Sequence, residues 1–165
     1  MFYILENNSV YERNGDDVFP DDKIMTDFTT FEKVIGFSYK NQNRKYKKIL
    51  IRTESSFVSG LPQQLCFVDH KHEKSLESLS LDDTLWLNGK KDKIISIENI
   101  EENGYVMPLT DSGTIVINGY KFSCYTTDIN SKVIEQTVKV VKHIPLETIR
   151  QQMLNKVLSE QVKFS

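Results

Sequence analysis

The sequence predicts a mainly β fold, a flat and mostly antiparallel β-disc followed by one or two C-terminal helices. Three observations predict this class. Short runs of β-branched and aromatic residues suit the pleated surface of a sheet, and turn residues such as Asn118-Gly119 separate the runs. After Thr126 the apolar residues change to a helical spacing. We therefore expect a β domain at residues 1–128 and a helical C-terminal extension at residues 129–165, packed on or beside it.

Composition restricts the class of function. The chain has 165 residues, with 21 basic and 23 acidic residues and a formal net charge of −2. The two signs are well mixed, so we expect no nucleic-acid partner. No apolar run approaches the roughly 20 residues of a transmembrane helix, and the apolar start at residues 1–5 is too short for a signal peptide. Two cysteines cannot form a disulfide framework. We expect a cytoplasmic or otherwise intracellular protein.

The first half of the chain is predicted to form strands and turns. Phe2 to Leu5 is a short strand, and residues 24–39 form a long β-rich stretch. The basic, polar run at residues 40–48 is predicted to be a loop at a hairpin tip, and Ile49 to Thr53 is a clear strand.

The chain also contains a weak internal repeat. Leu81-Asp82-Asp83-Thr84-Leu85 repeats the pattern of Gly15-Asp16-Asp17-Val18-Phe19. Repeats of this kind indicate two related β-halves about a pseudo-twofold axis. An unrelated β-barrel is the alternative, and it would lack that twofold relation.

The segment from Gly104 to Thr126 has the clearest local signals. Tyr105 to Leu109 is apolar, and the turn residues 110–113 follow it. Residues 114–117 are β-branched throughout, and Asn118-Gly119 is a strong hairpin signal. We predict two strands joined by a tight turn, then a second turn and a third strand.

The same segment closely resembles the closing block of the hedgehog/intein (Hint) autoprocessing domain, in its hedgehog C-terminal form. The matching residues fall in register without a gap, and they are Pro108-Leu109-Thr110, Gly113 to Gly119 and Ser123-Cys124-Tyr125. Earlier steps of the family pattern resemble Leu5-Glu6, Gly15 to Phe19 and Asp27 to Phe31. The resemblance implies a Hint-like β-disc with pseudo-twofold halves.

The residues that catalyse autoprocessing in this family are replaced in this chain. A leading Cys attacks the preceding carbonyl there, and we expect this nucleophile to be absent, because the chain starts at the first predicted strand with no cysteine ahead of it. The family's Thr-x-x-His motif, which protonates the leaving nitrogen, aligns on Leu61 and Gln64, and the hedgehog Asp aligns on Lys33. Leu lacks a hydroxyl, and Gln cannot shuttle a proton near neutral pH. The resemblance thus implies a catalytically inactive Hint domain, a pseudoenzyme that acts as a binding or structural module.

Cys124 is the family signature residue that this chain retains. Free cysteines are among the most buried side chains, and we favour that interpretation here. The alternative is a diverged autoprocessing cysteine enzyme that uses Cys124 as its nucleophile, with His70 or Asp111 as base. That alternative requires an exposed thiol within hydrogen-bond reach of the base.

One cluster has the residue types of a metal site. It consists of Cys66, Asp69, His70, His72 and Glu73. A continuous strand would place Cys66, His70 and His72 on one face, yet a firm zinc site needs four ligands at a recognised spacing. We interpret the cluster as a solvated turn and predict no metal. The sequence has no phosphate loop or dinucleotide fingerprint, so we also predict no cofactor.

The C-terminal extension contains two periodic segments. Residues 133–144 are near helical spacing, although their β-branched content leaves a strand possible. The next segment fits an amphipathic helix with Leu146, Ile149, Met153, Val157 and Leu158 on one side and Glu147, Arg150, Gln151 and Lys156 on the other. We expect its apolar side to pack on the disc, with a partner or self-association face as the alternative. An unknown protein partner could bind this helix or the former catalytic cleft.

Overall fold

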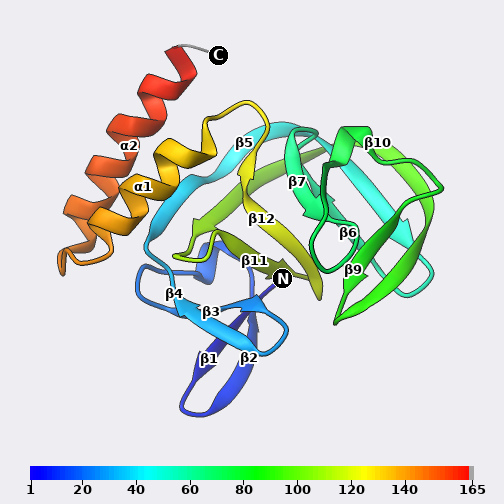
Figure 1. The fold of residues 1–165 in the computed structure, drawn as a ribbon, viewed down its shortest axis with the longest axis horizontal. Helices are drawn as coiled ribbons and strands as arrows, with labels where there is room; N and C mark the ends of the chain where they lie inside the picture. The colour runs from blue at the N-terminus through cyan, green and yellow to red at the C-terminus, as the bar shows by residue number, and fades with distance from the viewer. Residues whose placement is uncertain (164–165) are drawn as a thin grey trace.

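The computed structural model describes residues 1–163 as two antiparallel sheets and two C-terminal helices (Figure 1). The smaller sheet has the order β2-β1-β3-β4, with β1 (Phe2–Glu6), β2 (Ser9–Arg13), β3 (Lys23–Asp27) and β4 (Thr30–Lys33). The larger sheet has the order β6-β5-β10-β9-β12-β7-β8, and β11 pairs with β12. Its strands are β5 (Gly36–Thr53), β6 (Phe57–Gly60), β7 (Gln64–Phe67), β8 (Glu73–Ser75), β9 (Thr84–Leu87), β10 (Lys90–Leu109), β11 (Thr114–Ile117) and β12 (Tyr120–Thr126).

Two long antiparallel strands, β5 and β10, connect the parts of the disc. Their pairing runs from Ile94 opposite Thr53 to Leu109 opposite Gly36. The predicted loop at residues 40–48 is wrong, because this run is the middle of β5. Its basic side chains lie opposite acids of β10, as in the ion pair between Lys48 and Glu102 (2.9 Å). An exposed two-stranded ribbon has polar residues on both faces, so its sequence looks like a loop.

The turn at Asn118-Gly119 joins β11 and β12 as predicted. Both residues have positive φ, 52° and 85°, as a tight primed turn requires. The prediction for the preceding turn is wrong in one respect. Residues 105–109 of β10 pair with β5, whereas β11 pairs with β12. Residues 110–113 therefore connect strands that have different partners and do not close a hairpin.

Side chains from both sheets and both helices fill one hydrophobic core. Residues 133–144, which could have been helix or strand, are mainly the helix α1 (Ser131–Val141). Its Ile134, Val138 and Val141 are buried at helical spacing in the same core as Phe122 of β12. The helix α2 is Glu147–Lys163, and the 3₁₀ turns are η1 (Gly15–Asp17) and η2 (Leu76–Ser78). The division of the chain at residue 128 stays a prediction.

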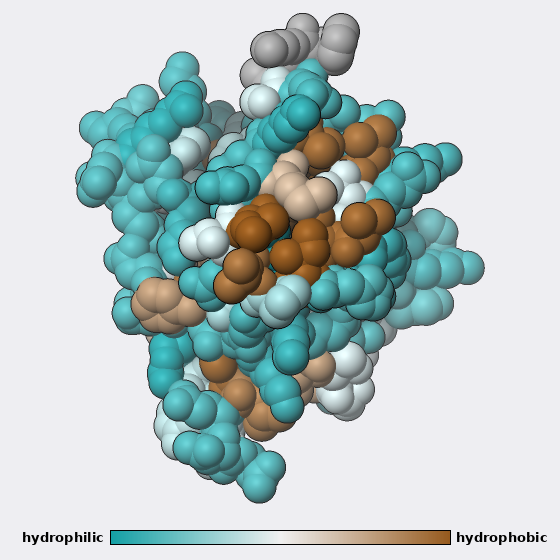
Figure 2. Space-filling view, turned by 90° about the vertical axis from the view of Figure 1, so that its left-hand side faces the viewer, coloured by the Kyte–Doolittle hydropathy of each residue, from teal (hydrophilic) through white to brown (hydrophobic). Residues whose placement is uncertain are grey.

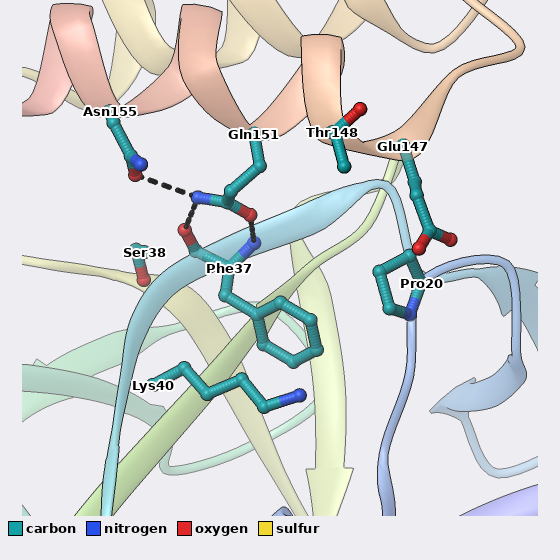
Figure 3. Close-up of a pocket in the computed structure, with 8 residues that line it drawn as sticks. All are labelled: Pro20, Phe37, Ser38, Lys40, Glu147, Thr148, Gln151 and Asn155. Atoms are coloured by element: carbon teal, nitrogen blue, oxygen red, sulfur yellow. Dashed lines mark hydrogen bonds between the residues drawn. The ribbon is translucent and has the colours of Figure 1, made fainter.

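The side of α2 that faces the disc differs in part from the prediction, because Val157 and Leu158 pack against the core whereas Leu146, Ile149 and Met153 are exposed. Arg150 is only 3 % exposed, and its guanidinium donates to the carbonyl oxygens of Ile35 (3.0 Å) and Ile144 (2.8 Å). Gln151 pairs with the backbone N–H and C=O of Phe37 at 2.8 and 2.9 Å (Figure 3). Polar side chains therefore hold the helix on the disc by hydrogen-bonding to backbone groups of β5 and of the residue just before it. Leu154 is the apolar anchor on this side, with no exposed surface.

Neither helix within residues 1–163 has the combination of length and apolar character needed to cross a membrane.

Candidate functional site

Gln64, which the sequence resemblance aligns with the family's catalytic histidine, lies buried at the start of β7. Its side chain is 1 % exposed, and its Oε1 accepts a hydrogen bond from the Tyr105 hydroxyl at 2.6 Å. Its Nε2 has no hydrogen-bond partner among the described residues. Leu61, which the same resemblance aligns with the family's threonine, is 4 % exposed and belongs to the hydrophobic core. The turn between them therefore supplies one amide and no hydroxyl to the site.

Gln64 and Tyr105 face a polar cleft of about 360 Å³. Lys48 of β5 and Glu102 of β10 form an ion pair in its wall at 2.9 Å, and the Ser59 hydroxyl also donates to Glu102 (3.2 Å). The hydrogen bond from Lys48 lowers the pKa of Glu102 below its ordinary value. The other residues that line the cleft are Met1, Phe2, Asn14, Gly15, Asp16, Gln42, Val58, Asn103, Gly104, Val106, Ile117 and Asn118.

Tyr105 is the residue through which the cleft contacts the core. Burial, more than the neighbouring Tyr39, raises the pKa of its phenol well above the ordinary value, so the hydroxyl stays protonated as a donor. Its ring packs against Tyr39 in a T-shaped arrangement with centroids 5.2 Å apart. The cleft offers amides, hydroxyls, carboxylates and ammonium groups, and neither histidine nor cysteine is among the residues that line it. Such a surface is suited to hydrogen-bonding a polypeptide backbone.

Cys124 of β12 is buried, with 2 % of its surface exposed. Its Sγ lies 3.6 Å from the Thr110 hydroxyl, and burial raises the pKa of its thiol to about 12. The Asp111 carboxylate is bound instead by Lys139 (2.7 Å) and Lys142 (3.2 Å). His70 lies beside the ring of Trp86. The structure therefore does not place either suggested base in hydrogen-bonding contact with Cys124.

The residues of the metal-like cluster are not brought together. Cys66 is 1 % exposed in the core, and burial raises the pKa of its thiol to about 12. His72 lies in an exposed turn, where its Nδ1 is 2.8 Å from Asp69. The backbone N–H groups of Lys71 and His72 stabilise the Asp69 carboxylate and lower its pKa. Because this turn separates β7 from β8, the common face expected of a continuous strand does not form.

Sequence reasoning missed several polar residues near the site. Lys33, which the resemblance aligns with the hedgehog Asp, is exposed on β4, whereas the adjacent Glu32 accepts hydrogen bonds from the Thr26 hydroxyl (2.7 Å) and the Ser112 N–H (2.9 Å). Lys48 and Glu102 meet only because β5 pairs with β10. Their opposite charges along two long polar runs were the signal that could have revealed the pair.

The comparisons with known proteins match this geometry. A family model described as "Hint module" matches residues 12–163. The chain belongs to the Hint family. A search of curated proteins finds no match.

The solved structures to which this Hint domain is similar include inteins. The crystal structure of the gp41-1 intein aligns with a TM-score of 0.60 and 16 % sequence identity over 74 % of this chain and 93 % of that one. The DnaB intein from Synechocystis sp. PCC 6803 aligns with a TM-score of 0.60 and 15 % identity over the same shares of the two chains. At such identities the likeness shows the fold. The predicted Hint-type β fold is therefore confirmed, and the hedgehog C-terminal type stays a prediction.

Proposed function

We propose that this Hint domain is catalytically inactive and serves as a polypeptide-binding or structural module. The observation that supports this most directly is Gln64, buried and hydrogen-bonded to Tyr105 at the position where the family has its catalytic histidine. Protonation of a leaving amine requires a group that gains and loses a proton near the working pH. A glutamine amide does neither. Leu61 removes the hydroxyl of the same motif.

The burial of Cys124 argues against the alternative of a diverged cysteine enzyme. A nucleophilic cysteine reacts as its thiolate and needs a partly exposed, electropositive setting. With a pKa of about 12, the Cys124 thiol is almost wholly protonated at neutral pH. Its hydrogen-bonding neighbour is the Thr110 hydroxyl, which is not a base at this pH.

The polar cleft is the surface that supports a binding role. The Gln64 Nε2 is a buried donor without a partner among residues 1–163, and such a group costs free energy unless a bound acceptor pairs with it. A polypeptide segment supplies carbonyl acceptors at regular spacing. A nucleic-acid role is less well supported, because acids of β10 pair with Lys45 and Lys48 of the basic run. The two unpaired cysteines agree with an intracellular location.

The test is a fusion protein with a reporter domain ahead of Met1, treated with dithiothreitol or hydroxylamine. We expect the fusion to stay intact, while a parallel fusion to an active intein releases its reporter. Thiol-dependent release from this chain would contradict the proposal. If that release disappeared in a matched Cys124→Ser fusion, it would establish the cysteine-enzyme alternative instead.

A further inference from the structure

The two helices expose an apolar face that the disc does not cover. Four side chains with large exposed fractions belong to it: Val140 (63 %), Leu146 (60 %), Ile149 (40 %) and Met153 (39 %). Together with Val133 and Val157 they form what we call the outer helical surface. Figure 2, which views the molecule from the side where the helices lie, shows apolar side chains gathered into a patch with a hydrophilic rim. Large apolar patches with polar rims are typical of interaction sites.

The orientation of α2 keeps this surface turned outward. Besides the two carbonyl oxygens it binds, Arg150 forms an ion pair with Asp21 at 2.9 Å, and Gln151 is fixed on the backbone of Phe37. Turning the apolar stripe inward would break these bonds and leave the carbonyl oxygen of the buried Ile35 without the donor that Arg150 supplies, which costs free energy. The exposed stripe is therefore a stable feature of the folded chain.

The outer helical surface has a projecting part and a hollow part. Leu146 and Ile149 project at the start of α2. Further along, a groove of about 580 Å³ lies between α1 and α2. Its lining is mostly aliphatic, with Lys156 and Glu160 at the edge formed by α2, and it consists of Val133, Gln136, Thr137, Val140, Val141, Met153, Lys156, Val157 and Glu160.

We propose that this surface binds the same surface of a second copy of the chain, with the two α2 helices antiparallel about a twofold axis. Residues 146, 149, 153 and 157 recur at spacings of three and four, as in helices that pair along an apolar seam. An axis near residue 151 sets Leu146 of each copy against Val157 of the other, and Ile149 against Met153. The projecting part of each copy then enters the groove of the other, which is the self-complementarity that a twofold interface requires.

Charges around the surface agree with self-association. The same register places Glu160 of each copy just beyond the N-terminal end of the other copy's α2, where the helix dipole favours an acid. Glu147 lies on a different side of α2, where it lines the cavity beside Pro20 and Lys40 (Figure 3). The net charge of −2 is small enough that two copies repel one another weakly.

The first test measures the mass of the full chain by sedimentation velocity over concentrations from about 1 to about 500 µM. We expect a concentration-dependent dimer. The double variant Ile149→Glu/Met153→Glu should raise its dissociation constant at least about 30-fold, as the loss of central anchor residues does. The matched control is Leu81→Glu, at a position 56 % exposed outside the surface, which should leave the dimer intact. A chain that stays monomeric throughout the range overturns the proposal and leaves the surface to a different partner.

The second test uses cross-linking in nearly native chains and does not depend on the folding of the charged variant. Ile149→Cys protein is mixed with Met153→Cys protein under a mild oxidant, and we expect a disulfide-linked pair that contains one chain of each. The native Cys66 and Cys124 are 1 % and 2 % exposed and do not compete. Leu81→Cys protein is the control and should not cross-link to either. A dimer that forms in solution without this cross-link, or that persists in the double glutamate variant, shows a different interface and overturns the proposal.

Discussion

Two neighbouring regions of this Hint domain differ in how much of the family pattern they keep. The closing segment, residues 104–126, keeps the Pro-Leu-Thr and Ser-Cys-Tyr steps and is mostly buried. The turn from Leu61 to Gln64 keeps its place at the start of β7 but has neither the threonine nor the histidine. The regions are in contact, because the Tyr105 hydroxyl donates to Gln64 and Thr126 is the strand partner of Gln64.

The resemblance implies that framework and chemistry have been kept to different degrees. Leu61 replaces a polar residue and adds apolar surface to the core, where it is 4 % exposed. Gln64 replaces a titratable ring with an amide that is bonded within the fold. Leucine and glutamine cannot transfer a proton and leave no buried charge unpaired, but the Gln64 Nε2 has no hydrogen-bond partner among residues 1–163, which costs free energy. The predictions below test whether the two regions form one packed unit.

The largest effect should be on the reactivity of Cys124 in the closing segment. At pH 8, a thiol with a pKa of about 12 has roughly 1,000-fold less thiolate than one with the ordinary value near 9, so we expect iodoacetamide to label Cys124 and Cys66 at least that much more slowly than a free thiol. Mass spectrometry with and without urea measures the labelling. Burial raises the pKa of the Cys124 thiol in the folded state, so the buried thiol also makes folding stability depend on pH. Its contribution to stability is fully present below about pH 9 and is lost as pH rises towards about 12. Rapid labelling of native Cys124 would show that the segment is open.

A large loss of stability should follow from truncating the closing segment. Phe122 has no exposed surface, so Phe122→Ala should lower the free energy of unfolding by about 3–5 kcal/mol, through lost burial and the cavity left behind. Urea denaturation measures the change. Leu81→Ala, at a side chain 56 % exposed, is the matched control and should change the value by less than about 0.5 kcal/mol. Equal effects of the two variants would mean that the segment is not part of the core.

The same two regions explain which parts of the structure could be predicted from sequence. The Asn118-Gly119 hairpin was predictable because a positive φ at two successive residues is a local requirement. The partner of residues 105–109 was not, because strand pairing with β5 depends on contacts distant in the chain. The run at residues 40–48 was wrongly assigned to a loop for a related reason. Its basic side chains pair with acids of the neighbouring strand β10, which is distant in the sequence.

The motif positions stay a prediction from the resemblance, and the contacts around them could not be predicted from sequence. Alignment of short motifs located Leu61, Gln64 and Cys124, because these are adjacent to recognisable strands. It could not show that Tyr105 bonds to Gln64, or that Lys48 pairs with Glu102, because each pair joins different strands. The orientation of α2 was also misjudged. Amphipathic periodicity assigns the apolar side to the core, whereas here Arg150 and Gln151 satisfy backbone groups that no apolar residue could.

A moderate effect should come from the hydrogen bond that joins the two regions. Gln64→Leu leaves the buried Tyr105 hydroxyl without its acceptor and should cost about 1–3 kcal/mol of unfolding free energy. Adding Tyr105→Phe removes the stranded hydroxyl, so the double variant should be more stable than Gln64→Leu alone. A double-mutant cycle by urea denaturation measures the coupling. Additive effects of the two changes would mean that the hydrogen bond does not stabilise the fold.

The smallest effect should be at the rim of the cleft, where the Lys48–Glu102 pair is partly open to water. Glu102 is 49 % exposed at its side chain, so Glu102→Gln should cost only about 0.2–1 kcal/mol at pH 7, with less effect in high salt. The hydrogen bond from Lys48 lowers the folded pKa of Glu102, so this contribution is present above about pH 4.5 and is lost as pH falls through the lowered value. Urea denaturation of both proteins at pH 7 and in acid should therefore show a difference only at pH 7. A difference that persisted in acid would mean that Glu102 acts by packing, as the residues of the closing segment do, rather than by its charge.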